Sequence, residues 1–360
     1  MNSKERILAA LHGEPVDRLP WCPFLAYWWE HQPKSRQEQG QIAFLREIGA
    51  DALLRGFVQP FTVTYGGEIQ QETRQSDGIS WFIQHTPVGD LRTGSQYSPD
   101  GDTTYVVHHP IQRREDYRAL RALVTAMELR PQFEPVQQQI EAVGEDGLCV
   151  PLISPFGKTP FQALLEHYVG TEQLVYHLMD MPEEVEATLA LMNEKCIQAV
   201  YLAADSPAEV FITWEDSSTT NVSPRLFTKY IASQMNRWGE LLEQTGKALI
   251  HHACGHLKAL LPIMAQENIV AIESISPPPT GNVELWEARE IVGPELCLIG
   301  GIEPVHFLTL EDDAFEVYVR ELIERMPRKA FILANSDSCP PGVPEERFRR
   351  VGEIVKETSD

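Results

Sequence analysis

The 360-residue sequence has no run of apolar residues long enough to cross a membrane. A membrane-spanning helix needs roughly 20 predominantly apolar residues in succession. Residues 1–15 have the pattern of an amphipathic helix and lack the apolar centre of a secretory signal. We therefore expect a protein with no membrane partner.

Cysteine is scarce, and basic residues are outnumbered. The six cysteines are widely spaced and form no short disulfide framework, which favours a reduced, cytoplasmic setting. Lys and Arg total 30 against 52 Asp and Glu, which leaves a formal net charge of −22. Because such a surface repels polyanions, we expect no nucleic-acid partner.

The sequence also lacks repeats, low-complexity tracts and linkers. Its hydrophobic share of 43% is enough for a large core, and its charged share of 23% argues against disorder. This length is normal for one α/β barrel with insertions. We therefore expect a single domain over residues 1–360.

Short apolar segments alternate with helical stretches along most of the chain. The predicted strands are 21–25, 51–54, 148–153, 210–213, 248–252, 270–274, 296–300 and 330–334. The predicted helical stretches, after an N-terminal helix, are 36–48, 114–143, 160–203, 223–245, 256–267, 284–291, 312–327 and 344–357. Buried strands that alternate with helices form parallel sheets. Eight of them favour an α/β fold of the closed (β/α)8 TIM-barrel type, preceded by a helical extension; the alternative is an open sheet with one miscounted strand.

Residues 57–110 interrupt this pattern. They contain the turn pairs Gly66-Gly67, Asp77-Gly78 and Asp100-Gly101 between short alternating runs. Such pairs are typical of tight β-hairpin turns. We predict a β-meander inserted after the second strand.

Metal-binding residue types follow the predicted strands, whose C-terminal ends carry the active site in α/β barrels. His252 and Cys254 lie at the end of the fifth strand, and Cys339 follows the eighth. One imidazole and two thiolates suit Zn²⁺, and three protein ligands leave the open position of a catalytic zinc site. An isolated His-x-Cys pair is more often part of the core or surface, so the alternative is three packed residues without a metal.

Three acidic residues also lie at predicted strand ends: Glu215, Asp216 and Glu273. Each is a candidate general base, fourth metal ligand or substrate anchor. The alternative for each is a helix cap or an ion pair in a loop. The aromatic residues of 21–29 have two interpretations as well, a wall of an apolar substrate pocket or ordinary core packing.

Several segments resemble uroporphyrinogen-decarboxylase-like proteins, and together they span nearly the whole chain. They are Gly-Glu-Pro-Val-Asp-Arg-Leu-Pro at 13–20, His-Ala-Cys-Gly at 252–255, Pro-Pro-Pro-Thr-Gly-Asn at 277–282, Leu-Ile-Gly-Gly-Ile-Glu-Pro at 298–304 and the stretch 331–344. The resemblance implies the TIM barrel of that superfamily.

One segment of the decarboxylases has no counterpart here. In them, Arg-Gln-Ala-Gly-Arg soon after the first strand grips the carboxylates of the tetrapyrrole, whereas residues 24–31 contain no arginine. The methyltransferase branch instead binds zinc through His-x-Cys and a distant cysteine, matched by His252, Cys254 and Cys339. The sequence thus resembles the methylcobalamin:coenzyme M methyltransferases and the related corrinoid-dependent demethylation enzymes.

This resemblance implies a zinc-dependent methyltransferase. The methyl group would move between cobalamin carried by a partner corrinoid protein and a small thiol or a methoxy- or methylamine-type substrate. Zinc would activate the thiol as a thiolate or act as a Lewis acid on the methyl donor. The alternatives are a metal-free decarboxylase of the uroporphyrinogen type, a non-catalytic barrel that binds a small molecule or a corrinoid protein, and an unrelated zinc hydrolase.

Overall fold

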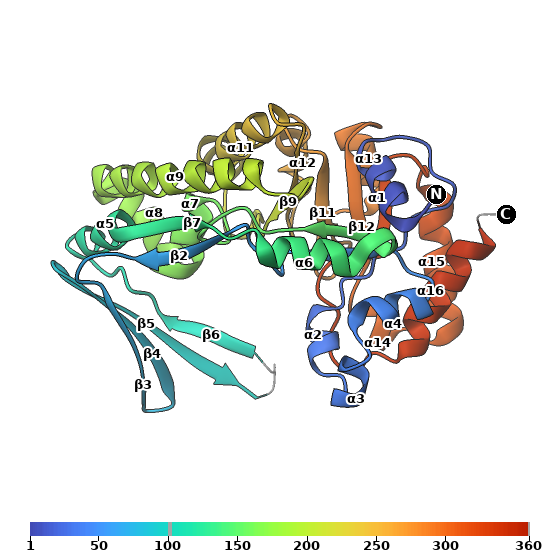
Figure 1. The fold of residues 1–360 in the computed structure, drawn as a ribbon, viewed down its shortest axis with the longest axis horizontal. Coiled ribbons are helices and arrows are strands. Elements are labelled where there is room, and N and C mark those ends of the chain that lie inside the picture. Colours follow the sequence, from blue (N-terminus) through green and yellow to red (C-terminus); the bar gives the residue numbers. More distant parts are fainter. Residues whose placement is uncertain (100–102, 359–360) are drawn as a thin grey trace. The chain divides into compact units, whose positions relative to one another are not determined.

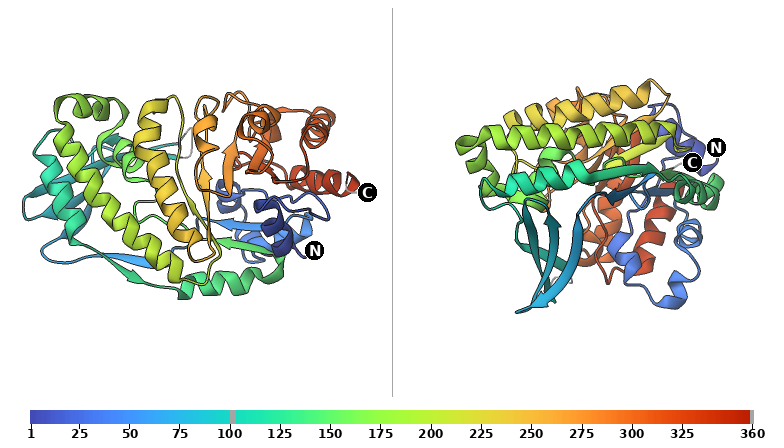
Figure 2. Two further views of the ribbon diagram at one scale, coloured as in Figure 1. Left: turned by 90° about the horizontal axis from the view of Figure 1, so that it is seen from above. Right: turned by 60° about the vertical axis from the view of Figure 1, so that its left-hand side comes forward.

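The structure is a computed structural model that describes residues 1–99 and 103–358, and it divides into two compact units. Unit 1 comprises Met1–Pro60, Phe133–Leu152 and Ala203–Asp360, and unit 2 comprises Phe61–Gln132 and Ile153–Leu202. Figures 1 and 2 show the ribbon from three directions. The single domain expected over residues 1–360 stays a prediction, since the chain passes between the units more than once.

Unit 1 contains a closed ring of parallel strands. They are β1 (Ala52–Arg55), β8 (Gly147–Val150), β9 (Val210–Thr213), β10 (Ala248–His252), β11 (Ala271–Ile275), β12 (Cys297–Ile302) and β13 (Phe331–Asn335). Strands β9 to β13 form one sheet and β1 pairs with β8, while a parallel bridge between Leu152 and Ile212 joins these two sets. Trp21 closes the ring, because it bridges Leu333 of β13 and its carbonyl accepts a hydrogen bond from the N–H of Asp51 at 2.7 Å. The predicted α/β TIM barrel is confirmed.

The first barrel segment is shorter than the predicted strand over 21–25. Only Trp21 forms a bridge, and helix α2 (Ala26–Glu30) begins soon afterwards. Pro20 and Pro23 flank this position and have no N–H to donate to a neighbouring strand. The segment therefore makes the few hydrogen bonds that close the ring and then leaves the sheet.

The helices of unit 1 cover the ring with apolar faces. Besides α2 they are α1 (Ser3–Leu11), α3 (Lys34–Gln37), α4 (Gln41–Glu47), α6 (Glu134–Val143), the 3-10 helix η1 (Gly144–Asp146), α10 (Pro224–Leu226), the π-helix η3 (Phe227–Ala232), α11 (Ser233–Glu243), α12 (Leu261–Met264), α13 (Leu285–Val292), α14 (His306–Thr309), α15 (Asp312–Arg325) and α16 (Glu345–Glu357). In α16, the three- and four-residue spacing of Phe348, Val351 and Val355 buries one face. Within the described part of the chain, no helix combines the length and hydrophobicity needed to cross a membrane.

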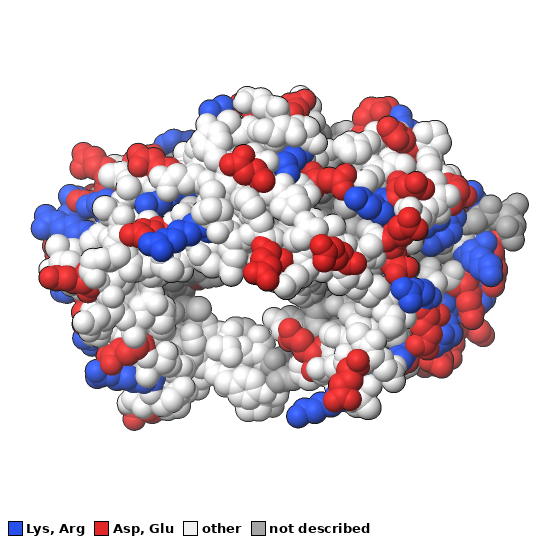
Figure 3. Space-filling view, in the orientation of Figure 1, with Lys and Arg blue, Asp and Glu red and all other residues white. Residues whose placement is uncertain are grey.

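Charges on the outer faces of α15 and α16 are interleaved rather than gathered by sign. Arg350 lies 2.8 Å from Glu316 and 3.0 Å from Glu357. Figure 3 shows basic and acidic side chains intermixed over these helices, on the right of the view. Such exposed pairs add little stability individually because solvent and salt screen them.

Unit 2 contains the predicted meander. Its elements are β2 (Phe61–Tyr65), β3 (Gln70–Ser76), β4 (Ile79–Thr86), β5 (Gly89–Ser98), β6 (Thr103–His108), α5 (Asp116–Ala126), β7 (Met127–Pro131), α7 (Pro160–Ala163), the π-helix η2 (Leu164–Val169), α8 (Thr171–Asp180) and α9 (Pro182–Asp205), the last of which ends in unit 1. Strands β3 to β6 pair in sequential antiparallel order, visible as the blue-green sheet in Figure 1. The Asp100-Gly101 turn lies outside the described residues.

The helical prediction over 114–143 is wrong at its centre. Strand β7 interrupts it and pairs antiparallel with β2, from Phe61 opposite Pro131 to Tyr65 opposite Met127. A residue that precedes proline is disfavoured in helical geometry, and pairing with β2 satisfies the backbone of β7 instead. The pairing partner β2 lies some 60 residues earlier in the chain. Local hydrophobic periodicity covers only neighbouring residues, so it gives no sign of this pairing.

The carboxylate of Asp51, just before β1, ties the N-terminal segment to the ring. It is fully buried and accepts hydrogen bonds from Arg6 Nη1 at 2.6 Å and Arg18 Nη2 at 2.8 Å. It also accepts one from the N–H of Trp21 at 3.3 Å. One side chain thus holds α1 and the two segments whose hydrogen bonding closes the ring.

We predict that Asp51→Ala lowers the free energy of unfolding by about 2–3 kcal/mol, because it removes the buried acceptor of Arg6 and Arg18, although Arg6 keeps its ion pair with Asp17. The measurement is urea unfolding followed by circular dichroism. The control is Asp146→Ala, which removes an exposed pair with Arg46 and should barely shift the midpoint. Equal shifts in the two variants would contradict the importance of burial at Asp51.

Candidate metal centre

His252 and Glu273 lie beside each other because β10 and β11 pair in parallel with these two residues as Cα partners. Strand partners project to the same side of a sheet. A carboxylate oxygen of Glu273 contacts Nδ1 of His252 in a short hydrogen bond. The other ring nitrogen, Nε2, therefore faces the opposite way, toward the loop that follows β9.

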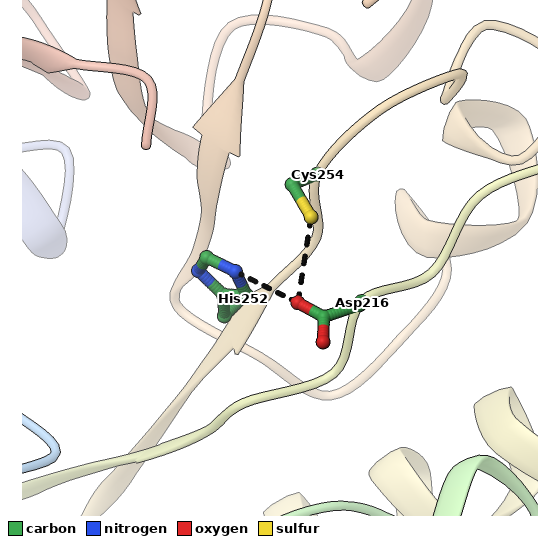
Figure 4. Close-up of side chains that lie close together, drawn as sticks. All are labelled: Asp216, His252 and Cys254. Carbon is green, nitrogen blue, oxygen red and sulfur yellow. Dashed lines mark hydrogen bonds and ion pairs between the residues drawn. The ribbon is translucent and has the colours of Figure 1, made fainter. Parts of the chain in front are cut away.

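That loop carries Asp216, which completes a group of three potential metal ligands. The ligand atoms of Asp216, His252 and Cys254 all lie within 4.8 Å of one another. Figure 4 shows the carboxylate between the other two side chains: Oδ1 lies 3.4 Å from His252 Nε2 and accepts a hydrogen bond from Cys254 Sγ at 3.4 Å. An imidazole, a thiol and a carboxylate thus converge where strands β9 and β10 end.

Hydrogen bonds between the loops after β9 and β10 hold this arrangement. The N–H of His256 donates to Ser218 Oγ, and the N–H of Thr219 donates to the carbonyl of His256, both at 3.0 Å. Gly255 has φ +85°, and a Cβ there would lie 3.0 Å from Ser218 Oγ. These bonds also explain why the helix predicted from 256 begins only at Leu261: the backbone of His256 is committed to the neighbouring loop.

His251 projects to the other side of β10, as strand alternation requires. It is fully buried, its Nδ1 lies 2.6 Å from Glu267 Oε2, and its Nε2 lies 3.4 Å from Ser217 Oγ. Since Ser217 follows Asp216 directly, these buried polar contacts support the loop after β9 from the side of β10 opposite His252. His251 is therefore a structural residue.

Arg55 and two aromatic residues surround the His252–Glu273 pair. Arg55 ends β1, is completely buried, and places Nε 3.0 Å from Glu273 Oε1. Its guanidinium lies over the ring of Phe24 at 4.6 Å, Phe24 stacks on Trp214 at 5.5 Å, and Trp214 meets His252 edge-on at 5.0 Å. Sequence reasoning missed Arg55; its only signal was a single arginine at the end of an apolar barrel strand.

Burial and neighbouring charge act in opposite directions on the pKa values of His252, which ends β10, and of Cys254 in the loop after it. Burial acts to lower the pKa of His252, but the charge of Glu273 and hydrogen bonds with Asp216 and Cys254 outweigh it and leave this pKa well above its usual value. Burial raises the pKa of Cys254 to about 11, against the smaller opposing influence of His252. At neutral pH without a metal, the pair is therefore an imidazolium and a thiol.

The pKa values of two carboxyl groups near His252 shift in opposite directions. Burial acts to raise the pKa of Glu273, but the charges of Arg55 and then His252 outweigh it and lower this pKa. Burial raises the pKa of Asp337 above the usual range for a carboxyl. Glu273 is thus a fixed anion, whereas Asp337 is the carboxyl group that accepts a proton more readily.

A cavity of about 350 Å³ opens onto these residues. Phe24, Tyr27, Trp214, Asp216, His252 and Asp337 are among the residues that line it. Both interpretations of the aromatic segment 21–29 therefore hold in part, since Phe24 and Tyr27 line the cavity while Trp21 and Trp28 are buried in the core. The cavity gives a small molecule access to Asp216 and His252.

Two of the residues named from the sequence lie outside that group. Cys339 is fully buried on the loop after β13, where its N–H donates to the carbonyl of Phe24 at 3.1 Å. Among the described residues, Cys339 is not one of those whose ligand atoms gather within 4.8 Å. Glu215 is also buried and accepts a hydrogen bond from Thr213 Oγ1 at 3.4 Å.

The donor set fits a zinc ion. Imidazole, thiolate and carboxylate are all zinc ligands, and softer sulfur donors disfavour Mg²⁺ and Ca²⁺. A metal-binding histidine also characteristically gives its second ring nitrogen to a carboxylate, which is the position of Glu273. These residues can therefore hold a metal through Nε2 of His252, Sγ of Cys254 and a carboxylate oxygen of Asp216.

The family model of uroporphyrinogen decarboxylase (URO-D) matches residues 92–358, about three quarters of the chain. The chain belongs to the uroporphyrinogen decarboxylase family. The match covers β9 to β13 and hence all three residues of the group in Figure 4. No curated protein sequence matches the chain significantly.

Solved structures give the fold of this uroporphyrinogen decarboxylase family member independently. A methyltransferase from Methanosarcina mazei superimposes with a TM-score of 0.65 at 18% identity, over 100% of both chains. A B12-independent methionine synthase from Shewanella sp. W3-18-1 aligns with a TM-score of 0.49 at 11% identity, over 95% of this chain and 98% of that one. The first of these shares the fold of this chain along its full length.

We predict that Gly56→Ala disturbs the site through Trp214. Gly56 has φ +77°, and a Cβ there would lie 2.1 Å from Cζ2 of Trp214, which packs against His252. Strain at positive φ and overpacking should together cost about 2–5 kcal/mol. Tryptophan fluorescence should also change as the indole moves.

The matched control is Gly49→Ala. Gly49 has a similar φ of +73° but nothing within 4 Å of a Cβ. It should cost only about 1–2 kcal/mol and leave the fluorescence unchanged. The same fluorescence change in both variants would argue against a specific contact at Gly56.

Proposed function

We propose that this chain is a zinc-dependent methyltransferase that works with a corrinoid protein. The methyl group moves between cobalamin carried by that partner and a small thiol or a methoxy- or methylamine-type substrate. The observation that carries the proposal is the convergence of His252, Cys254 and Asp216 at the C-terminal ends of barrel strands, with Glu273 behind the imidazole. The full-length likeness in fold to a methyltransferase supports it.

In this proposal His252, Cys254 and Cys339 are the permanent zinc ligands. Zinc held there would favour the deprotonated form of a bound thiol, or polarise a methyl donor, at neutral pH. Asp216, whose carboxylate lies between His252 and Cys254, would be a further ligand that a substrate could displace. Glu273 orients His252, and Glu215, which accepts a hydrogen bond from Thr213, is a candidate substrate anchor on the loop after β9.

The residues around the cavity suit the rest of the reaction. Phe24 and Trp214 form an apolar wall that excludes water beside His252, and Asp337 is placed to hold a proton near the substrate. The corrinoid of the partner would supply or accept the methyl group when bound. In the thiol direction, Asp337 would take up the proton that the substrate sulfur gives up; in the opposite direction, it would return a proton to the demethylated substrate.

The first test is the zinc content of the purified protein, measured by elemental mass spectrometry. We expect about one zinc per chain, lost in Cys254→Ser and reduced in Cys339→Ser. Cys297→Ala, which changes a buried cysteine in β12, should retain the metal. Demethylation of free methylcobalamin with a simple thiol, followed by absorbance, should follow the zinc content.

Absence of metal in the wild-type protein under chelator-free conditions would overturn the proposal and favour the alternative of a metal-free decarboxylase. Full metal content in Cys339→Ser together with its loss in Asp216→Asn would instead make Asp216 the third permanent ligand. The pair of variants therefore separates the ligand set implied by the family resemblance from the one in Figure 4.

Metal binding should also release protons. Neighbouring groups raise the pKa of His252 in spite of its burial, and burial raises the pKa of Cys254 and Cys339, so each carries a proton at neutral pH without metal and must lose it to bind zinc. We predict release of about three protons per zinc at pH 7, so that affinity rises with pH. Calorimetry in two buffers of different ionisation enthalpy measures this number; binding without proton release would contradict the assigned ligands.

A further inference from the structure

Arg55, Glu273 and His252 form a continuous chain of ionic contacts across three barrel strands. Arg55 comes from β1, Glu273 from β11 and His252 from β10. The two oxygens of Glu273 have separate partners: Oε1 lies 3.0 Å from Arg55 Nε, and Oε2 contacts His252 Nδ1. The side chains of Arg55 and Glu273 are 0% exposed, and that of His252 is 4% exposed.

Each member of this chain depends on the next for its position. A buried carboxylate without a compensating cation is costly, so without Arg55 the carboxylate of Glu273 would leave its present position for water or other partners. Such a move would break its charge-assisted hydrogen bond to Nδ1 of His252, a type about twice as strong as a neutral one. Arg55 supplies the compensating cation, with Nε 3.0 Å from Glu273 Oε1.

Arg55 is itself held in place by few groups. Its planar guanidinium lies over Phe24, and among the described residues Glu273 is its one carboxylate partner within ion-pair distance. Phe24 in turn is anchored by its backbone, which donates to Asn335 Oδ1 at 2.9 Å. The position of the guanidinium is thus fixed by β1 and by the same loop region that lines the cavity.

We propose that Arg55 is a positioning residue of the metal site: by neutralising Glu273 it holds His252 with Nε2 directed at Asp216 and Cys254. It touches none of these ligand atoms and acts only through Glu273. The inference rests on the proposed zinc site, and it adds a residue from outside the predicted ligand set and from a different strand.

The test is the affinity of the metal-free protein for Co²⁺, measured by titration of the thiolate-to-cobalt absorption and by competition with a chelator. Residues that orient a metal ligand typically contribute 10- to 100-fold in affinity. We expect Arg55→Met to lower Co²⁺ affinity on the order of 10-fold or more. Arg55→Lys, which keeps a cation near Glu273, should recover part of the loss.

The matched control is Arg289→Met. Arg289 is also a buried arginine of unit 1, but it donates to the main-chain carbonyls of Gly293, Leu296 and Ala330. Its loss should lower stability and leave Co²⁺ affinity unchanged. An equal fall in affinity in both variants would reduce Arg55 to a general contributor to folding and overturn the inference.

A double variant tests whether Arg55 acts through Glu273. Arg55→Met with Glu273→Gln removes both buried charges, so it can fold even if Arg55→Met alone does not. Its affinity should equal that of Glu273→Gln, because the two residues then form one coupled unit. A further drop in the double variant, or wild-type affinity in folded Arg55→Met, would overturn the inference, whereas a wild-type protein that binds no Co²⁺ would overturn the proposed zinc site instead.

Discussion

Hydrogen bonding around a closed ring of parallel strands is the constraint on which the site depends. Parallel strands in a ring bring all their C-terminal ends to one side, so that residues distant in the sequence meet there. The register of β10 against β11 makes His252 and Glu273 neighbours, and β1 brings Arg55 to the same carboxylate. The ring closes at Trp21 through a handful of backbone bonds, and the buried carboxylate of Asp51 secures that junction.

The interior of the barrel mouth contains charges that are stable only in combination. Arg55 and Glu273 are both removed from water, and isolated burial of either would be costly. Arg55 and Glu273 compensate each other, and the second oxygen of Glu273 contacts the imidazole of His252. A second buried pair lies on the other side of β10. It consists of His251 and Glu267, and His251 also contacts Ser217 in the loop that carries Asp216.

Much of the fold was predictable because it depends on local pattern. Short apolar runs between amphipathic stretches marked the barrel strands, and β9 and β10 have the predicted bounds. The errors lie where distant contacts override local preference. Met127–Pro131 became a strand because β2 pairs with it, and His256 stayed out of a helix because its backbone bonds to Ser218 and Thr219.

The sequence by itself determined the alternation of strands and helices, the inserted meander, and the choice of His252, Cys254, Asp216 and Glu273 as candidates, since residue type and strand-end position are local properties. Only the tertiary structure decided which candidates lie together. It placed Asp216 beside His252 and Cys254, turned Glu273 to Nδ1 of the imidazole, and left Glu215 and Cys339 outside the group. It also brought in Arg55, because strand order in a closed ring, rather than distance along the chain, determines which charges share one buried space.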